Sequence, residues 1–218
     1  LPTLPGIKLK AVYLPMEKVG GDLYDLIPMK GGLAVFVGDV SGHGIPAAML
    51  AAMIKMLISH FPESDKTPAA FLEGINRDLY GKTADNFLTC VLGVLSEDGR
   101  EFVFANGGHP AFIQLREGKG SWHKTHGRIL GCLSDVDVEN GRVELQKGDR
   151  LILFTDGFVE AMDAKKNPFG EEKFMALNER YSSMPLEEHL GSLVAEIYDY
   201  QASDDFQDDL TLVGIEVE

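Results

Sequence analysis

The sequence contains little cysteine. Its 218 residues include two cysteines, Cys90 and Cys132, which are too few for a disulfide framework. Both lie in or next to apolar runs, a pattern that predicts two buried, reduced thiols in a cytoplasmic protein. The sequence also lacks HExxH, CxxC and paired-histidine patterns, so it offers no recognisable zinc site.

Long apolar runs and an excess of basic residues are also missing. No run approaches the roughly 20 apolar residues of a membrane span, and no basic region precedes a small-residue cleavage site. The chain carries 34 acidic against 20 basic residues, for a formal net charge of -14. Because phosphate backbones and anionic lipids attract basic surfaces, we expect neither nucleic acid nor membrane as a partner.

The composition is that of a folded domain. Hydrophobic residues make up 44% and charged residues 25% of the chain, which is enough to bury a full core. No linker rich in proline, glycine or serine divides the sequence, so we expect residues 1–218 to form a single catalytic domain. The chain starts at Leu1 and enters a strand pattern almost at once, and we therefore expect it to be the C-terminal part of a longer regulatory protein.

Hydrophobic periodicity predicts strands in hairpins and helices in pairs. Residues 22–28 and 33–39 indicate a hairpin that turns at Gly31-Gly32. Apolar residues at nearly every position predict a packed helix at 46–60, and a second helix is predicted to begin after Thr67 as N-cap. Further strands are predicted at 7–14, 87–95, 101–106, 111–115, 142–145, 150–154 and 211–217, and further helices at 171–181 and 186–202. Without regular alternation of strand and helix, this order favours an α+β layered sandwich.

Four widely separated aspartates have the local setting of a metal site. They are Asp22, Asp39, Asp156 and Asp208, and three of them adjoin an apolar run where a strand meets a turn. In an antiparallel hairpin, the start of the first strand lies beside the end of the second, so we expect Asp22 next to Asp39. Sites built from carboxylates alone select hard cations such as Mg²⁺ or Mn²⁺.

Two other readings of these motifs fail. Gly20-Gly21-Asp22 resembles the start of the diguanylate cyclase motif, but Leu23-Tyr24 follows where that motif requires an acidic and an aromatic residue. The sequence also contains no G-x-x-x-x-G-K-[ST] phosphate-binding loop.

Taken together, the motifs resemble those of the metal-dependent Ser/Thr protein phosphatases, the PPM class, and more narrowly the bacterial SpoIIE/RsbU-type branch. The motifs are Gly20-Gly-Asp-Leu-Tyr-Asp25, Gly38-Asp-Val-Ser-Gly-His-Gly-Ile-Pro-Ala-Ala48, Asn106-Gly-Gly-His-Pro110, Leu151-Ile-Leu-Phe-Thr-Asp-Gly-Phe-Val-Glu-Ala161, Phe169-Gly-Glu-Glu172 and Asp208-Asp-Leu-Thr211. They run in order over nearly the whole chain. The resemblance implies a four-layer α-β-β-α sandwich, in which two antiparallel sheets are flanked by helices.

The resemblance also implies a site that holds two Mn²⁺ or Mg²⁺ ions. Asp39 would bridge both ions and the backbone carbonyl of Val40 would be a further ligand. The remaining ligands would be Asp22, Asp156 and Asp208. Asp208 is favoured over Asp209 because the family's ligand is the first acid of the closing motif, and Asp209 stays as the alternative.

The role of His43 is left open by the sequence. It lies close to Asp39 and could protonate the leaving serine oxygen, but its flanking glycines equally suit a turn histidine that bonds to backbone. An arginine that holds the substrate phosphate in eukaryotic members is missing upstream of Asp22, and Lys18 is a weak substitute.

The implied function is hydrolysis of phosphoserine on a partner protein by a metal-bridging hydroxide. The resemblance suggests a STAS-type anti-sigma-factor antagonist as substrate, within a sigma-factor regulatory pathway, and control by an upstream regulatory domain. It leaves a homodimer as one option. The alternative is a catalytically weak phosphoprotein-binding or signalling scaffold, against which the retention of all four aspartates argues.

Overall fold

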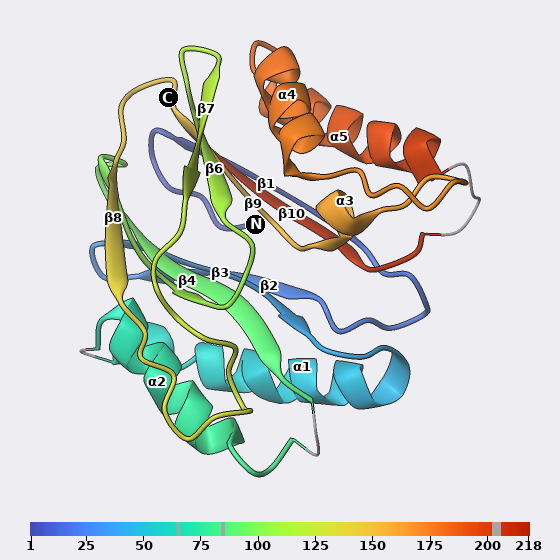
Figure 1. Ribbon diagram of the computed structural model, residues 1–218. Coiled ribbons are helices and arrows are strands. Elements are labelled where there is room, and N and C mark those ends of the chain that lie inside the picture. Colours follow the sequence, from blue (N-terminus) through green and yellow to red (C-terminus); the bar gives the residue numbers. More distant parts are fainter. Residues whose placement is uncertain (65, 84–85, 202–205) are drawn as a thin grey trace.

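The computed structural model describes residues 1–64, 66–83, 86–201 and 206–218, and in these ranges the strands form two antiparallel sheets (Figure 1). Sheet A has the order β1-β10-β9-β6-β7, and sheet B has the order β2-β3-β4-β5-β8. The strands of sheet A are β1 (Ile7–Leu14), β10 (Leu210–Val217), β9 (Arg150–Phe154), β6 (Phe112–Arg116) and β7 (Lys119–His123). Those of sheet B are β2 (Leu23–Met29), β3 (Gly32–Val40), β4 (Leu88–Ser96), β5 (Glu101–Gly107) and β8 (Asn140–Glu144).

Helices cover the outer face of each sheet. Helices α1 (Gly44–Ile58) and α2 (Pro68–Leu79), with the short η1 (Phe61–Glu63), lie on sheet B. Helices α4 (Glu171–Tyr181) and α5 (Leu186–Gln201) lie on sheet A, beside the single turn α3 (Gly157–Glu160). Figure 1 shows the two helical layers on opposite sides of the two sheets. The predicted α-β-β-α sandwich is confirmed.

Strand β3 packs against sheet A on one face and against helices on the other. Its side chains alternate between two cores: Leu33, Val35 and Val37 face the space between the sheets, and Ala34 and Phe36 face the helices α1 and α2. Successive residues of a strand point to opposite faces, and both faces of this strand are covered. This is why its sequence is apolar at almost every position. A third core lies between sheet A and the helices α3, α4 and α5.

Helix α1 carries apolar residues on its exposed face as well as on its buried face. Its buried face, which includes Leu50 and Ile54, rests on sheet B. The opposite side exposes Ile45, Met49, Met53 and Met56. The stretch Gly44–Glu63 has the length and hydropathy of a membrane span, but the buried half of α1 belongs to the core of the sandwich, as in a core helix of a folded domain.

Local signals predicted most elements well. Helix α2 begins at Pro68, and the Thr67 hydroxyl caps it by accepting a hydrogen bond from the Ala70 N–H at 3.4 Å. Strand β7 and the turn α3 were not predicted, because neither has a periodic apolar pattern. The last residue of the predicted helix 186–202 lies outside the described residues. Cys90 is buried as expected, whereas Cys132 is exposed, which corrects the prediction of two buried thiols.

Candidate metal centre

The β2–β3 hairpin brings Asp22 and Asp39 together. Leu23 pairs with Gly38 in the antiparallel register, so Asp22 precedes the first paired residue of β2 and Asp39 follows its partner in β3. The Val40 N–H donates to the Gly21 carbonyl at 3.3 Å, which continues the pairing past the two aspartates. The adjacency predicted from the hairpin is confirmed.

Asp22 is anchored from the other sheet. The hydroxyls of Thr155 and Thr211 each donate to its Oδ2 at 2.7 Å, and the side chain is buried. Thr155 follows β9 and Thr211 lies in β10, so two strands of sheet A hold a carboxylate that precedes a strand of sheet B. Burial raises the pKa of Asp22 to about 8, and the charge of Asp39 adds to the rise, while the two hydroxyls act in the opposite direction.

Asp39 lies in the same electrostatic environment. Burial raises its pKa to about 7, and the negative charges of Asp156, Asp208 and Asp209 add to the rise. A hydrogen bond with the Asp22 carboxyl acts in the opposite direction. Two carboxyl groups this close and this poorly solvated cannot both ionise at low cost. The site therefore favours a cation over further negative charge.

The turn after β9 and the segment before β10 supply the remaining carboxylates. Asp156 occupies the N-cap position of α3, and its pKa is raised by burial and then by Glu160. Burial also raises the pKa of Asp208, as do the charges of Asp156 and Asp209, whereas His43 lowers it. Asp156 and Asp208 thus influence each other and both influence Asp39, although they are far apart in the sequence.

The carboxylate of Asp209 forms hydrogen bonds with backbone. Its Oδ1 accepts the Met16 N–H at 2.7 Å and its Oδ2 accepts the Asp22 N–H at 3.3 Å. The side chain is buried and ties the loop before β2 to β10. Both of its oxygens are therefore used to hold backbone. The side chain of Asp208 accepts the Asp209 N–H at 2.8 Å through Oδ1, which leaves its Oδ2 free of a protein donor among the described residues.

Two glycines allow this close packing. A Cβ atom on Gly20 would lie 1.9 Å from Asp209 Oδ2, and a Cβ atom on Gly21 would lie 2.4 Å from the Val40 carbonyl oxygen. Any other residue would push these groups apart, because real Cβ atoms do not approach so closely. The Gly-Gly of the motif is thus required by the contact of the loop with Asp209 and with the Val40 carbonyl.

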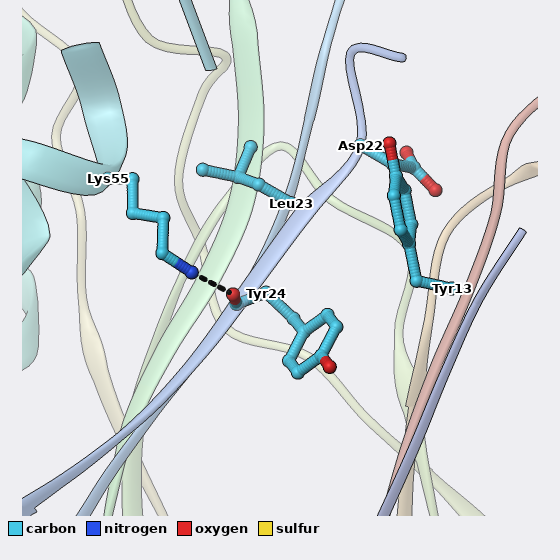
Figure 2. A pocket seen from close by; sticks show the side chains of 5 residues that line it. All are labelled: Tyr13, Asp22, Leu23, Tyr24 and Lys55. Carbon is cyan, nitrogen blue, oxygen red and sulfur yellow. Dashed lines mark hydrogen bonds between the residues drawn. The ribbon is translucent and has the colours of Figure 1, made fainter. Parts of the chain in front are cut away.

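The lysine that shares a pocket with Asp22 does not form an ion pair with it. Asp22 lines a pocket of about 210 Å³ together with Tyr13, Leu23, Tyr24 and Lys55. In Figure 2 the Asp22 carboxylate lies beside the Tyr13 ring, and the Lys55 ammonium points to the Tyr24 carbonyl, to which it donates at 3.3 Å. Lys55 also pairs with Asp25 at 3.6 Å. In the described part of the chain, no lysine or arginine forms an ion pair with any of the four predicted metal ligands or with Asp209.

His43 stands at the mouth of this cluster as the N-cap residue of α1. Its side chain is 74% exposed, and Nδ1 lies 3.2 Å from Glu17 Oε1. It therefore pairs with a carboxylate and not with backbone, which disfavours the turn-histidine reading. Glu17 and Lys18, the weak substitute for the missing arginine, line an adjacent open pocket of about 620 Å³ with Val19, Gly44 and Ile45.

The donor set fits hard divalent cations. It consists of carboxylates and a backbone carbonyl, and oxygen ligands of this kind suit Mg²⁺ and Mn²⁺. Among the carboxylates, Asp22 is buried, Asp39 and Asp156 are half-buried, and Asp208 is exposed. Within the described ranges, no three acidic, histidine or cysteine side chains stand close enough to hold a metal ion as they are placed. Because like charges repel, we expect the carboxylates to draw closer only when cations neutralise them.

Comparison with known proteins decides the family. The family model described as Stage II sporulation protein E (SpoIIE) matches residues 29–218. The chain belongs to the SpoIIE family. The family assignment made from the motifs, and with it the class of phosphatases, is confirmed.

Two curated relatives from Bacillus subtilis (strain 168) are named as phosphoserine phosphatases. RsbU is 27% identical over 213 residues, which cover 94% of this chain and 63% of that protein. RsbP is 20% identical over 162 residues, which cover 71% of this chain and 40% of that protein. The SpoIIE-family chain thus spans less than two thirds of the length of these relatives.

Solved structures share the fold. The SiaA-PP2C domain of Pseudomonas aeruginosa superposes with a TM-score of 0.86 at 24% identity, over 96% of this chain and 86% of that chain. The PP2C phosphatase domain of SpoIIE from Bacillus subtilis, solved with a fragment of its regulatory domain, gives a TM-score of 0.79 at 20% identity, over 97% and 63% of the two chains. These likenesses support the two-sheet sandwich described above.

Proposed function

We propose that this SpoIIE-family chain is a Mg²⁺- or Mn²⁺-dependent protein-serine/threonine phosphatase domain. The observation that carries the proposal is the cluster of four carboxylates, contributed by separate segments of both sheets, that forms no ion pair with a lysine or arginine among the described residues. Asp22 is buried and Asp39 and Asp156 are half-buried, so their negative charge is costly unless cations compensate it. The names of the curated relatives indicate phosphoserine as the group that is hydrolysed.

The proposed ligands are those predicted from the motifs. Asp39 would hold the cations, and the Val40 carbonyl, which follows it at the end of β3, would be a further ligand. The other ligands are Asp22, Asp156 and Asp208. When bound, the cations supply a hydroxide nucleophile at neutral pH and stabilise the negative charge that develops on the phosphoryl group.

The protein's own groups then have separate tasks. Thr155 and Thr211 orient Asp22 through its Oδ2, and Asp209 holds the loop that precedes it. His43 would protonate the leaving serine oxygen. Glu17, whose Oε1 lies 3.2 Å from His43 Nδ1, would orient the ring so that Nε2 is available for this transfer.

We propose a phosphorylated partner protein of the STAS type as substrate, in a cytoplasmic sigma-factor pathway, because the motifs resemble the RsbU-type branch. On the same basis, residues 1–218 form one catalytic domain that an upstream regulatory domain controls. The oligomeric state is open. The acidic net charge of -14 disfavours recognition of nucleic acid or anionic membrane by this domain.

Turnover of para-nitrophenyl phosphate and of a phosphoserine protein with and without Mn²⁺ tests the proposal. Metal-dependent release of phosphate from both, lost in Asp39→Asn, is the expected result. A scaffold would bind the phosphoprotein with equal affinity in the wild type and in Asp39→Asn, and would release no phosphate from either substrate.

A further inference from the structure

One buried histidine that is not a proposed metal ligand forms hydrogen bonds with both sheets near the metal centre. His109 belongs to the Asn106-Gly-Gly-His-Pro110 motif, which begins in the last two residues of β5, and only 1% of its surface is exposed. Asn106 fixes its backbone, since the Asn106 Oδ1 accepts the His109 N–H at 2.9 Å and the Asn106 Nδ2 donates to the His109 carbonyl at 3.1 Å. The position of the imidazole is therefore set by its own turn.

Both ring nitrogens of His109 have a partner. Nδ1 lies 2.8 Å from Thr89 Oγ1, and Nε2 lies 3.1 Å from the Phe154 carbonyl oxygen. Burial lowers the pKa of His109 to about 3, so the ring is neutral and carries one N–H. A carbonyl can only accept, so that N–H is on Nε2. Nδ1 then accepts the proton of the Thr89 hydroxyl, and the direction of both hydrogen bonds is fixed.

The two hydrogen-bond partners of the ring, Thr89 and Phe154, are each next to a segment that carries a proposed metal ligand. Thr89 in β4 is the register partner of Asp39 in β3, within sheet B. Phe154 is the last residue of β9 in sheet A, immediately before Thr155, which bonds Asp22, and Asp156. The imidazole thus connects the strand beside Asp39 to the strand end that leads into Asp156.

We propose that His109 and Thr89 are positioning residues, which hold the Asp39 strand and the Asp156 turn at the spacing that two bound cations require. This inference rests on the proposed metal-dependent function. The carboxylates on either side repel one another, and a neutral ring bonded at both ends resists their separation without adding charge. Removing a residue that holds a metal ligand in position commonly lowers metal affinity or activity by about 10- to 100-fold.

The test compares Thr89→Val with Thr89→Ser. Valine has nearly the shape of threonine but cannot donate to Nδ1, whereas serine keeps the hydroxyl. We expect calorimetry to give Mn²⁺ affinity at least about tenfold weaker in Thr89→Val and near the wild-type value in Thr89→Ser. Ser96→Ala is the matched control, because Ser96 is at the other end of β4 and its hydroxyl accepts the Arg100 and Glu101 N–H groups.

The outcomes separate this inference from the proposed function. If Thr89→Val binds Mn²⁺ as tightly as the wild type, or if Ser96→Ala weakens binding equally, the positioning role is wrong while the metal centre stands. If the wild type binds no Mn²⁺ and hydrolyses no phosphoester, the metal centre itself is wrong and the inference falls with it.

A second measurement needs no variant. Nitrogen-15 chemical shifts of the His109 imidazole in the wild-type protein at pH 7 report which nitrogen carries the proton. We expect the neutral form with the proton on Nε2, both with and without Mn²⁺. A proton on Nδ1 would remove the hydrogen bond to the Phe154 carbonyl, and a charged ring would contradict a neutral link between the strands. Either result would overturn the inference.

Discussion

The two halves of the metal centre are built differently. The hairpin half, Asp22 and Asp39, is held by strand pairing and by hydroxyls, and burial raises these two pKa values to about 8 and about 7. The turn half, Asp156 and Asp208, sits on the short turn before α3 and on the segment before β10. Sheet B therefore sets Asp22 beside Asp39, whereas the position of both relative to Asp156 and Asp208 depends on how sheet A packs on sheet B.

The largest expected effect comes from the hairpin half. Asp39→Asn should reduce Mn²⁺-dependent phosphoester turnover by more than about a hundredfold. Removing a metal ligand should lower turnover more than removing a residue that only supports a ligand, which costs about 10- to 100-fold. Steady-state kinetics measure the effect, with circular dichroism as the check of folding. A folded variant that keeps a substantial share of wild-type turnover would contradict the assignment of Asp39.

Substitutions of the neighbouring acids Asp208 and Asp209 should affect different properties. Asp208→Asn should weaken Mn²⁺ binding by about tenfold or more with little loss of stability. Asp209→Asn should instead lower the free energy of unfolding by about 1–3 kcal/mol, because the Asp209 carboxylate accepts the N–H groups of Met16 and Asp22. Calorimetry and urea unfolding of both variants measure this, and the reverse pattern would make Asp209 the ligand.

Removing a hydroxyl that holds Asp22 should have a smaller effect. Thr211→Val leaves Asp22 Oδ2 with the Thr155 hydroxyl as its remaining side-chain donor, so we expect about tenfold weaker Mn²⁺ binding. Thr211→Ser keeps the donor and is the matched control. Equal affinities in the two variants would mean that the hydroxyl does not orient the carboxylate.

Metal should stabilise the folded protein. A cation that binds the native state alone at a hundred times its Kd adds about 2.7 kcal/mol, which corresponds to a rise of about 5–10 °C in Tm for a chain of this size. Differential scanning fluorimetry with Mn²⁺ and with the chelator EDTA measures the rise. Asp39→Asn should show little of it, and an equal rise in this variant would point to binding elsewhere.

The smallest effect is on the pH dependence of the metal-free protein. The folded pKa values of Asp22 and Asp39 lie above the ordinary value of 3.8, so the native state binds more protons than the unfolded state between about pH 4 and pH 8. The contribution of these groups to stability is full below pH 4 and is lost as pH rises through 7 and 8.

We therefore expect the Tm of the metal-free protein to fall by a few degrees more between pH 5 and pH 8 in the wild type than in Asp22→Asn. Mn²⁺ should reverse this difference, because it binds the ionised carboxylates. Identical pH profiles for the wild type and Asp22→Asn without metal would show that the hairpin half ionises normally.

The sequence alone determined the features that depend on near neighbours. The hairpin of β2 and β3 follows from alternation around a Gly-Gly turn, and its geometry places Asp22 beside Asp39 without knowledge of the rest of the chain. The start of α2 follows in the same way from Thr67 and Pro68. These are local effects of turn chemistry, strand register and capping, so the printed residues suffice to predict them.

Only the tertiary structure decided what joins the two sheets. The hydroxyls that orient Asp22 lie 133 and 189 residues away from it in the sequence. The carboxylate of Asp209 accepts two backbone N–H groups, whereas the pKa of Asp208 responds to the charges of Asp156 and His43. Nothing in the Asp-Asp pair itself assigns these directions. They arise because sheet A packs on sheet B across a shared core, and that long-range packing fixes which oxygen meets which donor.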